Sequence, residues 1–367
     1  MGWSSWNHFH IDISEQLIRE QADAMVASGM KDAGYSFINI DDGYFGGRDS
    51  NGNLLSHPEK FPSGMKSLAD HIHSKGLKAG IYSDAGDNTC ASISQRDVLG
   101  KGVGLYGHDK QDLTHLLKDW DYDFIKIDWC GGRGMGLNDQ VRYTEIGLLI
   151  REIRPDVVYN ICRWKFPGEW ALKVADSWRV SGDIRPTFNS VMGILDLNAD
   201  LWKYSSAGHF NDMDMLQVGR GMSLDEDRTH FTMWCMLNSP LLAGNDLRHM
   251  SRETIDILTN TEIIALNQDP LAYQARKLAD KGNTEIWAKP LGSVDGGIVA
   301  VVLLNRSGSA KTIGLDLETV GIDPKTPIGL HDLWKKEDIS PEKMNFEVPK
   351  HGVVVLRIKG KSIGNIY

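Results

Sequence analysis

The stretch from Tyr122 to Gly132, YDFIKIDWCGG, decides the fold of this chain. An apolar run ends abruptly in an aspartate, a cysteine and two glycines, which is typical of a buried parallel strand that opens into a loop. Lys126 and Asp128 are two residues apart, so on a strand both side chains point to the same face. If that face lines the inside of a barrel, an amine and a carboxylate meet at one mouth.

The alternation of strand and helix continues on both sides of this stretch. The predicted strands lie at residues 2–6, 35–40, 78–82, 122–128, 157–162, 177–183, 209–216 and 241–243. The predicted helices begin near residue 14 and then span 65–74, 112–120, 140–153, 170–175, 190–204, 228–237 and 255–267. About eight such repeats over roughly 270 residues match the count and size of a (β/α)8 TIM barrel.

The pattern changes after Asp269-Pro270. Residues 285–289, 297–304 and 352–357 are β-rich runs between turn residues, and no helical periodicity separates them. We therefore predict two domains: a catalytic α/β barrel over residues 1–272 and a C-terminal antiparallel β-sandwich over residues 273–367.

Composition excludes several kinds of partner. The 367 residues carry a formal net charge of -9, which argues against nucleic acid or an anionic membrane surface. No apolar run reaches the roughly 18 residues of a transmembrane helix. The first residues show no basic-then-apolar leader, so the protein is expected to be intracellular, or its leader lies outside this sequence.

The four cysteines are Cys90, Cys130, Cys162 and Cys235, and none forms a CxxC pair. A structural zinc site is therefore not expected, and buried thiols are the default interpretation. The chain also has 12 histidines, but none shows the His-x-His pattern at a strand end that a zinc barrel would have.

Polar side chains cluster at the C-terminal ends of the predicted barrel strands, the rim where active sites form in TIM barrels. They are Asp41, Asp42, Tyr82, Asp84, Lys126, Asp128, Cys162, Arg179, Asp183, Asp212 and Asp214. Any single aspartate has about even odds of being a helix N-cap. Capping explains so many carboxylates poorly, so the pattern predicts a polar pocket.

Two kinds of ligand suit such a pocket. Several carboxylates could hold a divalent metal, as in metal-dependent barrels. Alternatively, aspartates accept hydrogen bonds from sugar hydroxyls, two carboxylates cleave a glycosidic bond, and aromatic rings stack on the sugar. Tryptophans at or near strand ends favour the sugar; they are Trp3, Trp6, Trp129, Trp164 and Trp178.

A family resemblance rests on eight motifs in order. They are MGWSSWN (1–7), NIDDG (39–43), GIYSD (80–84), KIDWC (126–130), WRVSGD (178–183), NDMDML (211–216), SPLLAGNDL (239–247) and NQDPL (267–271). Together they resemble glycoside hydrolase family 27, the α-galactosidase (melibiase) and α-N-acetylgalactosaminidase family. The resemblance spans residues 1 to about 272, and the C-terminal β domain also fits this family's architecture.

The resemblance implies a retaining glycosidase with no metal or cofactor. Asp128 would be the nucleophile and Asp183 the general acid and base. The chemistry requires one ionised and one protonated carboxyl group. We expect the charges of Lys126 and Arg179 to keep Asp128 ionised, and Asp183 to be the more desolvated of the pair.

The resemblance also assigns the sugar contacts. The substrate-binding residues would be Trp6, Asp41, Asp42, Tyr82, Lys126, Cys162, Arg163, Arg179 and Asp214. It further implies a disulfide between Cys90 and Cys130, which replaces the free-thiol interpretation and indicates an exported protein in a periplasmic, extracellular or other oxidising compartment.

The sequence departs from the family after Cys162. The α-galactosidases have Glu there and the α-N-acetylgalactosaminidases a small residue such as Ser, whereas this chain has Arg163. A bulky Arg163 leaves little room for an N-acetyl group, and Asp41 suits a sugar with a 6-hydroxyl. We therefore expect terminal α-linked galactose on an oligosaccharide or glycan as substrate. The alternatives are an α-N-acetylgalactosaminidase, a β-L-arabinopyranosidase or a non-catalytic carbohydrate-binding protein. The natural glycan and the oligomeric state stay open.

Overall fold

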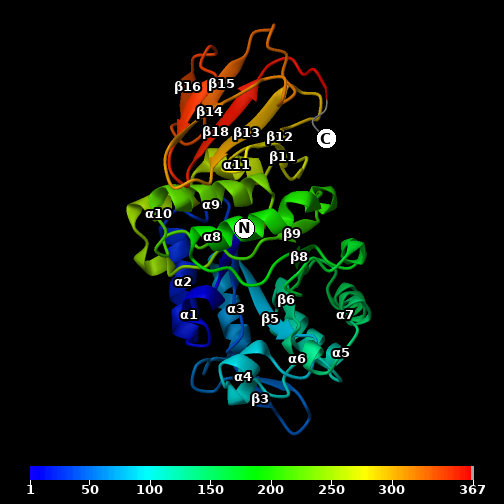
Figure 1. Cartoon of the computed structure of the whole chain (residues 1–367). Helices are drawn as coiled ribbons and strands as arrows, with labels where there is room; N and C mark the ends of the chain where they lie inside the picture. Colours follow the sequence, from blue (N-terminus) through cyan, green and yellow to red (C-terminus); the bar gives the residue numbers. More distant parts are fainter. Residues whose placement is uncertain (365–367) are drawn as a thin grey trace. The chain divides into compact units, whose positions relative to one another are not determined.

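The computed structural model describes residues 1–364 (Figure 1). The chain forms two compact units. The first contains residues Met1–Asp183 and Leu241–Met250, and the second contains Ile184–Pro240 and the chain from Ser251 onwards. No helix within residues 1–364 is long and apolar enough to cross a membrane.

The first unit is built on parallel strands in the order β10-β1-β2-β5-β6-β7-β8. Their bounds are β1 (Gly2–Ser4), β2 (Phe37–Asn39), β5 (Lys78–Asp84), β6 (Phe124–Asp128), β7 (Val158–Ile161), β8 (Ser177–Arg179) and β10 (Leu242–Ala243). The eighth strand in the order, β9 (Phe210–Asp212), belongs to the second unit. The predicted (β/α)8 barrel is confirmed.

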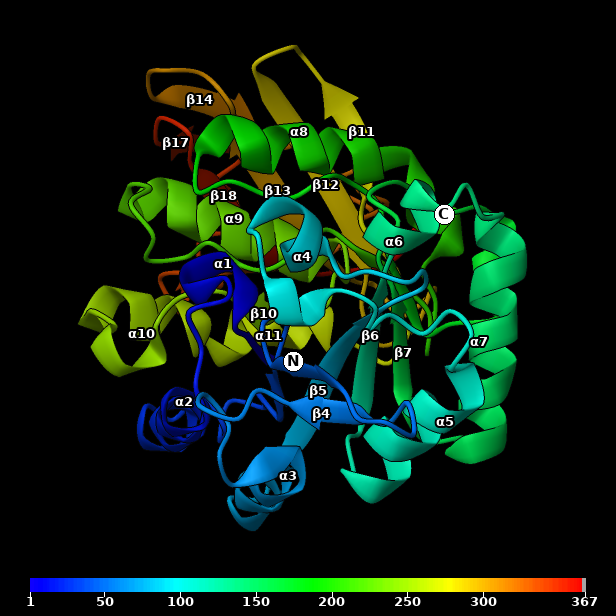
Figure 2. The ribbon, with the colours of Figure 1, turned by 90° about the horizontal axis from the view of Figure 1, so that it is seen from below.

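The register of β5 and β6 determines which side chains meet. Tyr82 lies opposite Lys126, and Asp84 lies opposite Asp128. The carboxyl ends of the two strands therefore coincide, and the loops that follow them begin at the same level. In Figure 2, β5, β6 and β7 lie side by side, with α5 and α7 beside them.

The α-helices of the first unit follow the predicted order as far as residue 153, with additions in the loops, whereas the helix predicted over 170–175 is a 3₁₀ helix, Glu169–Lys173. The α-helices are α1 (Trp6–Phe9), α2 (Glu15–Ala27), α3 (Gly64–Ser74), α4 (Cys90–Ser94), α5 (Asp109–Thr114), α6 (Cys130–Gly134) and α7 (Asp139–Ile153). The predicted cap of the first long helix is confirmed, because the Ser14 hydroxyl accepts from the Leu17 N–H at the start of α2. The antiparallel pair β3 (Phe45–Arg48) and β4 (Leu54–Ser56) was not predicted. Two glycines in β3 weaken its strand signal.

Three helices of the second unit differ from the predicted bounds. The helix α9 (Leu224–Met236) begins before residue 228, because Ser223 and Glu226 form a capping box at its start. The helix predicted over 255–267 is two helices, α10 (Arg252–Leu258) and α11 (Thr261–Asn267). The Asn260 side chain accepts from backbone N–H groups in the first turn of α11 and so caps the start of this helix. The helix α8 (Phe188–Asn198) continues as a short 3₁₀ turn.

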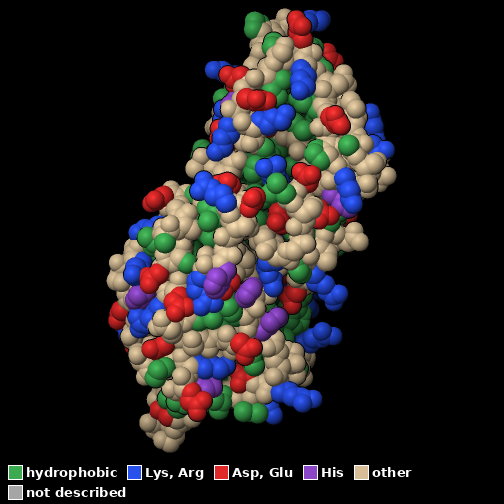
Figure 3. Space-filling model, turned by 90° about the vertical axis from the view of Figure 1, so that its left-hand side faces the viewer, with side chains coloured by type: hydrophobic (Ala, Val, Ile, Leu, Met, Phe, Trp, Pro, Cys, Tyr) green, Lys and Arg blue, Asp and Glu red, His purple; other side chains and the backbone are tan. Residues whose placement is uncertain are grey.

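The C-terminal part of the second unit is antiparallel and confirms the predicted β domain. One sheet has the order β11-β12-β13-β18-β15-β16, and β14 pairs with β17. The bounds are β11 (Arg276–Asp280), β12 (Thr284–Pro290), β13 (Ile298–Asn305), β14 (Lys311–Gly314), β15 (Gly329–Asp332), β16 (Glu337–Ile339), β17 (Asn345–Val348) and β18 (Val353–Lys359). The three predicted runs are β12, β13 and β18. A domain boundary at residue 272 stays a prediction. On the face shown in Figure 3, acidic and basic side chains are interspersed.

Candidate active site

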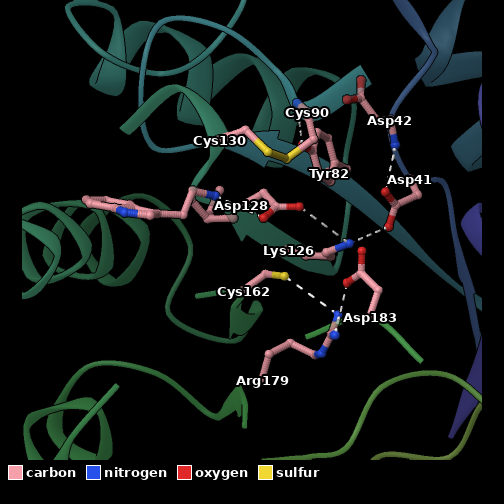
Figure 4. A network of polar contacts seen from close by, with 12 residues as sticks. Asp41, Asp42, Tyr82, Cys90, Lys126, Asp128, Cys130, Cys162, Arg179 and Asp183 are labelled. Carbon is pink, nitrogen blue, oxygen red and sulfur yellow. Dashed lines mark hydrogen bonds and ion pairs between the residues drawn. A yellow bond between two sulfur atoms is a disulfide. The ribbon is translucent and has the colours of Figure 1, made fainter. Parts of the chain in front are cut away.

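The ammonium group of Lys126 is the centre of a cluster of charged side chains (Figure 4). Its Nζ donates to Oδ2 of Asp41 at 2.9 Å and lies 3.8 Å from Oδ2 of Asp128. It also lies 5.3 Å from the centre of the Tyr82 ring. Burial alone would lower the pKa of Lys126, but the two aspartates offset this and the pKa is raised well above its usual value. The structure thus brings together four of the predicted site residues.

Asp128 is a buried carboxylate held at the end of β6. Its side chain is 7% exposed, and its Oδ1 accepts the backbone N–H of Trp129 at 3.0 Å. Burial raises the pKa of Asp128 to about 6, although Lys126 acts in the opposite direction. Lys126 thus acts in the expected direction, but burial outweighs it, and Asp128 is ionised only above about pH 6.

Asp183 lies in the loop after β8 and has the more exposed carboxylate. Its side chain is 63% exposed, and its Oδ1 accepts from Nη2 of the buried Arg179 at 3.1 Å. Partial desolvation raises the pKa of Asp183, but Arg179 and Lys126 outweigh it and the pKa is lowered. The expectation that Asp183 is the more desolvated of the two carboxylates is wrong, because its side chain is 63% exposed and that of Asp128 is 7% exposed. The loop leaves one side of Asp183 open to water, whereas Asp128 is enclosed by strands.

Cys162 and Arg179 lie beside these carboxylates (Figure 4). Nη1 of Arg179 donates to Sγ of Cys162 at 3.8 Å, and its Nη2 also donates to the Ser181 carbonyl at 3.2 Å. Burial, together with the charge of Asp128, raises the pKa of the Cys162 thiol well above its usual value. Cys162 is therefore a protonated thiol and not a nucleophile.

A disulfide joins Cys90 and Cys130, as the resemblance implied. These cysteines are the first residues of α4 and α6, so the bond ties the loop after β5 to the loop after β6. The Cys90 N–H also donates to the Tyr82 hydroxyl at 3.3 Å. The remaining cysteines, Cys162 and Cys235, are free and buried.

Asp42 points away from Lys126, unlike its neighbour Asp41 (Figure 4). Its two oxygens accept the backbone N–H groups of Gly43 at 2.9 Å and Ala91 at 2.8 Å. Burial raises the pKa of Asp42 to about 7. Asp42 holds the start of α4 through the Ala91 N–H, and its contact with a sugar stays a prediction.

Two further predicted contact residues, Trp6 and Arg163, have partners outside the Lys126 cluster. The Trp6 ring packs edge-on against His10, with ring centres 5.2 Å apart. Nε of Arg163 donates to Asp139 at 2.7 Å, and its guanidinium lies 5.6 Å from the centre of the Trp129 ring. The sugar contacts of Trp6 and Arg163 stay predictions.

Asp214 belongs to the second unit. Its oxygens accept from the N–H groups of Met215 at 2.7 Å and Ile184 at 3.0 Å. Its φ of +80° is rare for a residue other than glycine. Its predicted sugar contact also stays a prediction.

The sequence pattern placed Asp84 among the polar strand ends without giving it a role in the site. In the structure it is fully buried opposite Asp128 and accepts three backbone N–H groups. The pairing register of β5 and β6 is the signal that would have identified its role. Because the two strands end at the same level, Asp84 lies beside the residues that follow Asp128.

Two groups of potential metal ligands occur within residues 1–364. Asp84, Cys90 and Cys130 form one, but both sulfur atoms are used in the disulfide. The other, Asp70, His73 and Asp121, lies on the surface.

A parallel barrel with two carboxylates beside a lysine at its mouth fits a glycoside hydrolase. Comparison with known proteins gives the family. The family model described as Alpha galactosidase A matches residues 1–269, and the model of the Alpha galactosidase C-terminal beta sandwich domain matches residues 281–358. The chain therefore belongs to the α-galactosidase family, glycoside hydrolase family 27.

Individual relatives agree with this assignment. Alpha-galactosidase A of Cellvibrio japonicus is 44% identical, over 98% of this chain and 91% of that protein. The crystal structure of α-galactosidase I from Mortierella vinacea is 32% identical with a TM-score of 0.90, covering 99% of this chain and 97% of that one. An α-galactosidase from Saccharomyces cerevisiae solved with raffinose is 26% identical with a TM-score of 0.85, covering 98% of this chain and 97% of that one.

Proposed function

We propose that this protein is a retaining exo-α-galactosidase that removes terminal α-linked galactose from oligosaccharides or glycans. The observation that carries the proposal is the buried Asp128 beside Lys126, at the mouth of a barrel of the α-galactosidase family. The relatives named α-galactosidases, and the one solved with raffinose, support an α-galactoside as substrate.

The proposed reaction has two displacements. In the first, an oxygen of Asp128 attacks the anomeric carbon, the bond to the leaving oxygen breaks, and Asp183 gives that oxygen its proton. In the second, Asp183 removes a proton from water, the water oxygen attacks the anomeric carbon, and the bond to Asp128 breaks. Galactose leaves with its original anomeric configuration, and both carboxyl groups return to their starting states.

The reaction needs one ionised and one protonated carboxyl group, and the surroundings of Asp128 and Asp183 favour the ionised form of both above about pH 6. Asp128 must be ionised, which its pKa of about 6 allows above that pH. Asp183 must carry a proton, yet Arg179 lowers its pKa in the unliganded protein. A sugar covering the exposed side of Asp183 would exclude water and raise its pKa. The proposal therefore includes proton uptake by Asp183 when substrate binds.

The choice of galactose over N-acetylgalactosamine rests on the predicted contact of Arg163 with the sugar's 2-substituent. Asp139 and the Trp129 ring hold its guanidinium after β7, beside Cys162. A side chain anchored in this way cannot move aside freely for a larger 2-substituent. The alternatives are the α-N-acetylgalactosaminidase and β-L-arabinopyranosidase activities, and carbohydrate binding without catalysis.

We also propose that the protein works outside the reducing cytoplasm. The Cys90–Cys130 disulfide supports this, because such bonds persist mainly in oxidising compartments.

Purified protein assayed on aryl α-galactoside, α-N-acetylgalactosaminide and β-L-arabinopyranoside tests the substrate. We expect the highest kcat/KM on the galactoside, and faster turnover of either other substrate would contradict the choice of sugar. A fluorinated α-galactosyl fluoride that accumulates the glycosyl-enzyme should label Asp128. Asp128→Ala should abolish turnover, and label on another residue would contradict the assignment of the nucleophile.

A further inference from the structure

Asp84 at the end of β5 connects two loops of the candidate site. Its side chain is 0% exposed, and its Oδ1 accepts three backbone N–H groups. These come from Gly86 at 2.7 Å, Gly131 at 3.0 Å and Gly132 at 3.3 Å. The first lies in its own loop, and the other two lie in the loop that follows the nucleophile. One carboxyl oxygen thus holds both loops.

The backbone of the nucleophile is fastened to the same strand end. The Ala85 N–H donates to the Asp128 carbonyl at 3.0 Å, so β5 holds the main chain at Asp128 as well as three residues later. The two loops approach so closely that a Cβ on Gly86 would lie 2.0 Å from the Gly131 carbonyl carbon. Such contact leaves no room for a side chain, and only glycine fits there.

We propose that Asp84 is a positioning residue for the nucleophile, holding the backbone of residues 128–132 on β5 so that the Asp128 carboxylate keeps its place beside Lys126. The inference rests on the proposed function. Asp84 itself contacts neither the substrate nor the reacting atoms.

The disulfide does not replace the hydrogen bonds that Asp84 accepts from the two loops. It joins Cys130 to α4, a different partner, and it provides no acceptor for the N–H groups of Gly131 and Gly132. Each buried N–H left without a partner would destabilise the loop, because the group loses its acceptor in a place where water cannot replace it. The loop would relieve this cost by moving toward water, and the nucleophile three and four residues away from these N–H groups would move with it. A displacement of about 1 Å can cost about a hundredfold in rate.

An amide can replace the acid at this position. Burial, with the nearby charge of Asp128, raises the pKa of Asp84 to about 7. Below that pH the side chain is a neutral carboxylic acid whose carbonyl oxygen still accepts the three N–H groups. Asparagine has the same shape and the same acceptor. A serine hydroxyl can accept from the N–H two residues on but is too short for the opposite loop.

The experiment compares Asp84→Asn and Asp84→Ser with a matched control, Asp123→Ser. Asp123 joins the same two strands at their opposite end, where its Oδ2 accepts the Ala79 N–H at 2.9 Å. The measurements are kcat and KM on aryl α-galactoside at about pH 6, the rate of Asp128 labelling by the fluorinated galactosyl fluoride, Tm, and hydrogen exchange at Gly131 and Gly132.

We expect Asp84→Ser to lower kcat and the labelling rate about 10- to 100-fold, with KM within about threefold of wild type. Asp84→Asn should keep kcat within about tenfold, and Asp123→Ser should lower Tm while keeping kcat. Exchange at Gly131 and Gly132 should accelerate only in Asp84→Ser. A kcat loss in Asp84→Ser no larger than in Asp123→Ser overturns the proposal.

The experiment still decides the question if Asp84→Ser does not fold or if the wild-type protein is inactive on the galactoside. If Asp84→Ser does not fold, Asp84→Asn decides, because a loss of more than about tenfold in this variant contradicts a role as acceptor. If wild-type protein does not hydrolyse the galactoside, the proposed function fails, while hydrogen exchange still shows whether Asp84 holds the loop.

Discussion

Nζ of Lys126 lies 3.8 Å from Oδ2 of Asp128, the candidate nucleophile. This ion pair acts against burial, which raises the pKa of Asp128 to about 6. By lowering the pKa of Asp128, the lysine extends the pH range in which the nucleophile is ionised. It also binds Asp41, so one ammonium group connects the catalytic carboxylate with a predicted sugar-binding one.

Lys126→Met should move the acidic limb of the pH–kcat/KM profile upward from about pH 6, because the cation that lowers the pKa of Asp128 is lost. We expect a shift of about one pH unit and a lower kcat/KM. Steady-state kinetics between about pH 4 and pH 8 measure it. An acidic limb that stays in place would show that Lys126 does not act on the nucleophile.

Asp183→Ala should slow hydrolysis most for substrates with poor leaving groups. A dinitrophenyl galactoside leaves without protonation, whereas an oligosaccharide needs the proton of the acid, so the loss should be about 10²–10⁴-fold larger for the oligosaccharide. Added azide should restore turnover of the activated substrate by replacing base-assisted water. Equal losses on both substrates would contradict the role of Asp183.

Replacing Cys90 and Cys130 by serine should destabilise the protein. The bond joins residues separated by 40 positions, and loss of such a closed loop costs about 3–4 kcal/mol in the chain-entropy model. We expect a lower Tm and lower activity, since both joined loops border the site. Cys235→Ser, at a free cysteine, is the control. Unchanged Tm after complete reduction would exclude a stabilising role for the bond.

The Asp84→Asn variant should become more stable relative to wild type as the pH rises. The pKa of Asp84 is raised from 3.8 to about 7 in the folded protein, so its contribution to stability is complete below about pH 4 and is lost as pH rises through 7. The amide does not titrate. The unfolding free energy of the variant relative to wild type should therefore increase by about 1–4 kcal/mol between about pH 4 and pH 8, measured by chemical denaturation. A constant difference would contradict the raised pKa.

Arg163→Ser should narrow the preference for galactose. Removing the side chain that Asp139 and Trp129 hold opens space after Cys162, so kcat/KM for the N-acetylgalactosaminide should rise relative to that for the galactoside. A tenfold change in the ratio corresponds to about 1.4 kcal/mol. Asp139→Asn weakens the anchor alone and should give a smaller change. If neither variant changes the ratio of the two kcat/KM values, residues other than Arg163 determine the choice of sugar.

Local patterns predicted most of the fold. Apolar runs that end in aspartate, alternating with helical periodicity, indicated the barrel, because period and strand length are properties of neighbouring residues. Short elements were missed. The pair β3 and β4 and the strands β11 and β14 to β17 have too few apolar positions to show an alternation, and Asn260 divides one apparent helix through a single cap.

For the site, the sequence by itself determined which residue types stand at the strand ends, and its motifs identified the family. The tertiary structure alone decided their states. Asp128 is buried and Asp183 is open to water, although one ends a barrel strand and the other stands in the loop just after one, because burial depends on what other segments cover each carboxylate. The role of Asp84 likewise follows from strand register, which places it opposite Asp128 although 44 positions separate them along the chain.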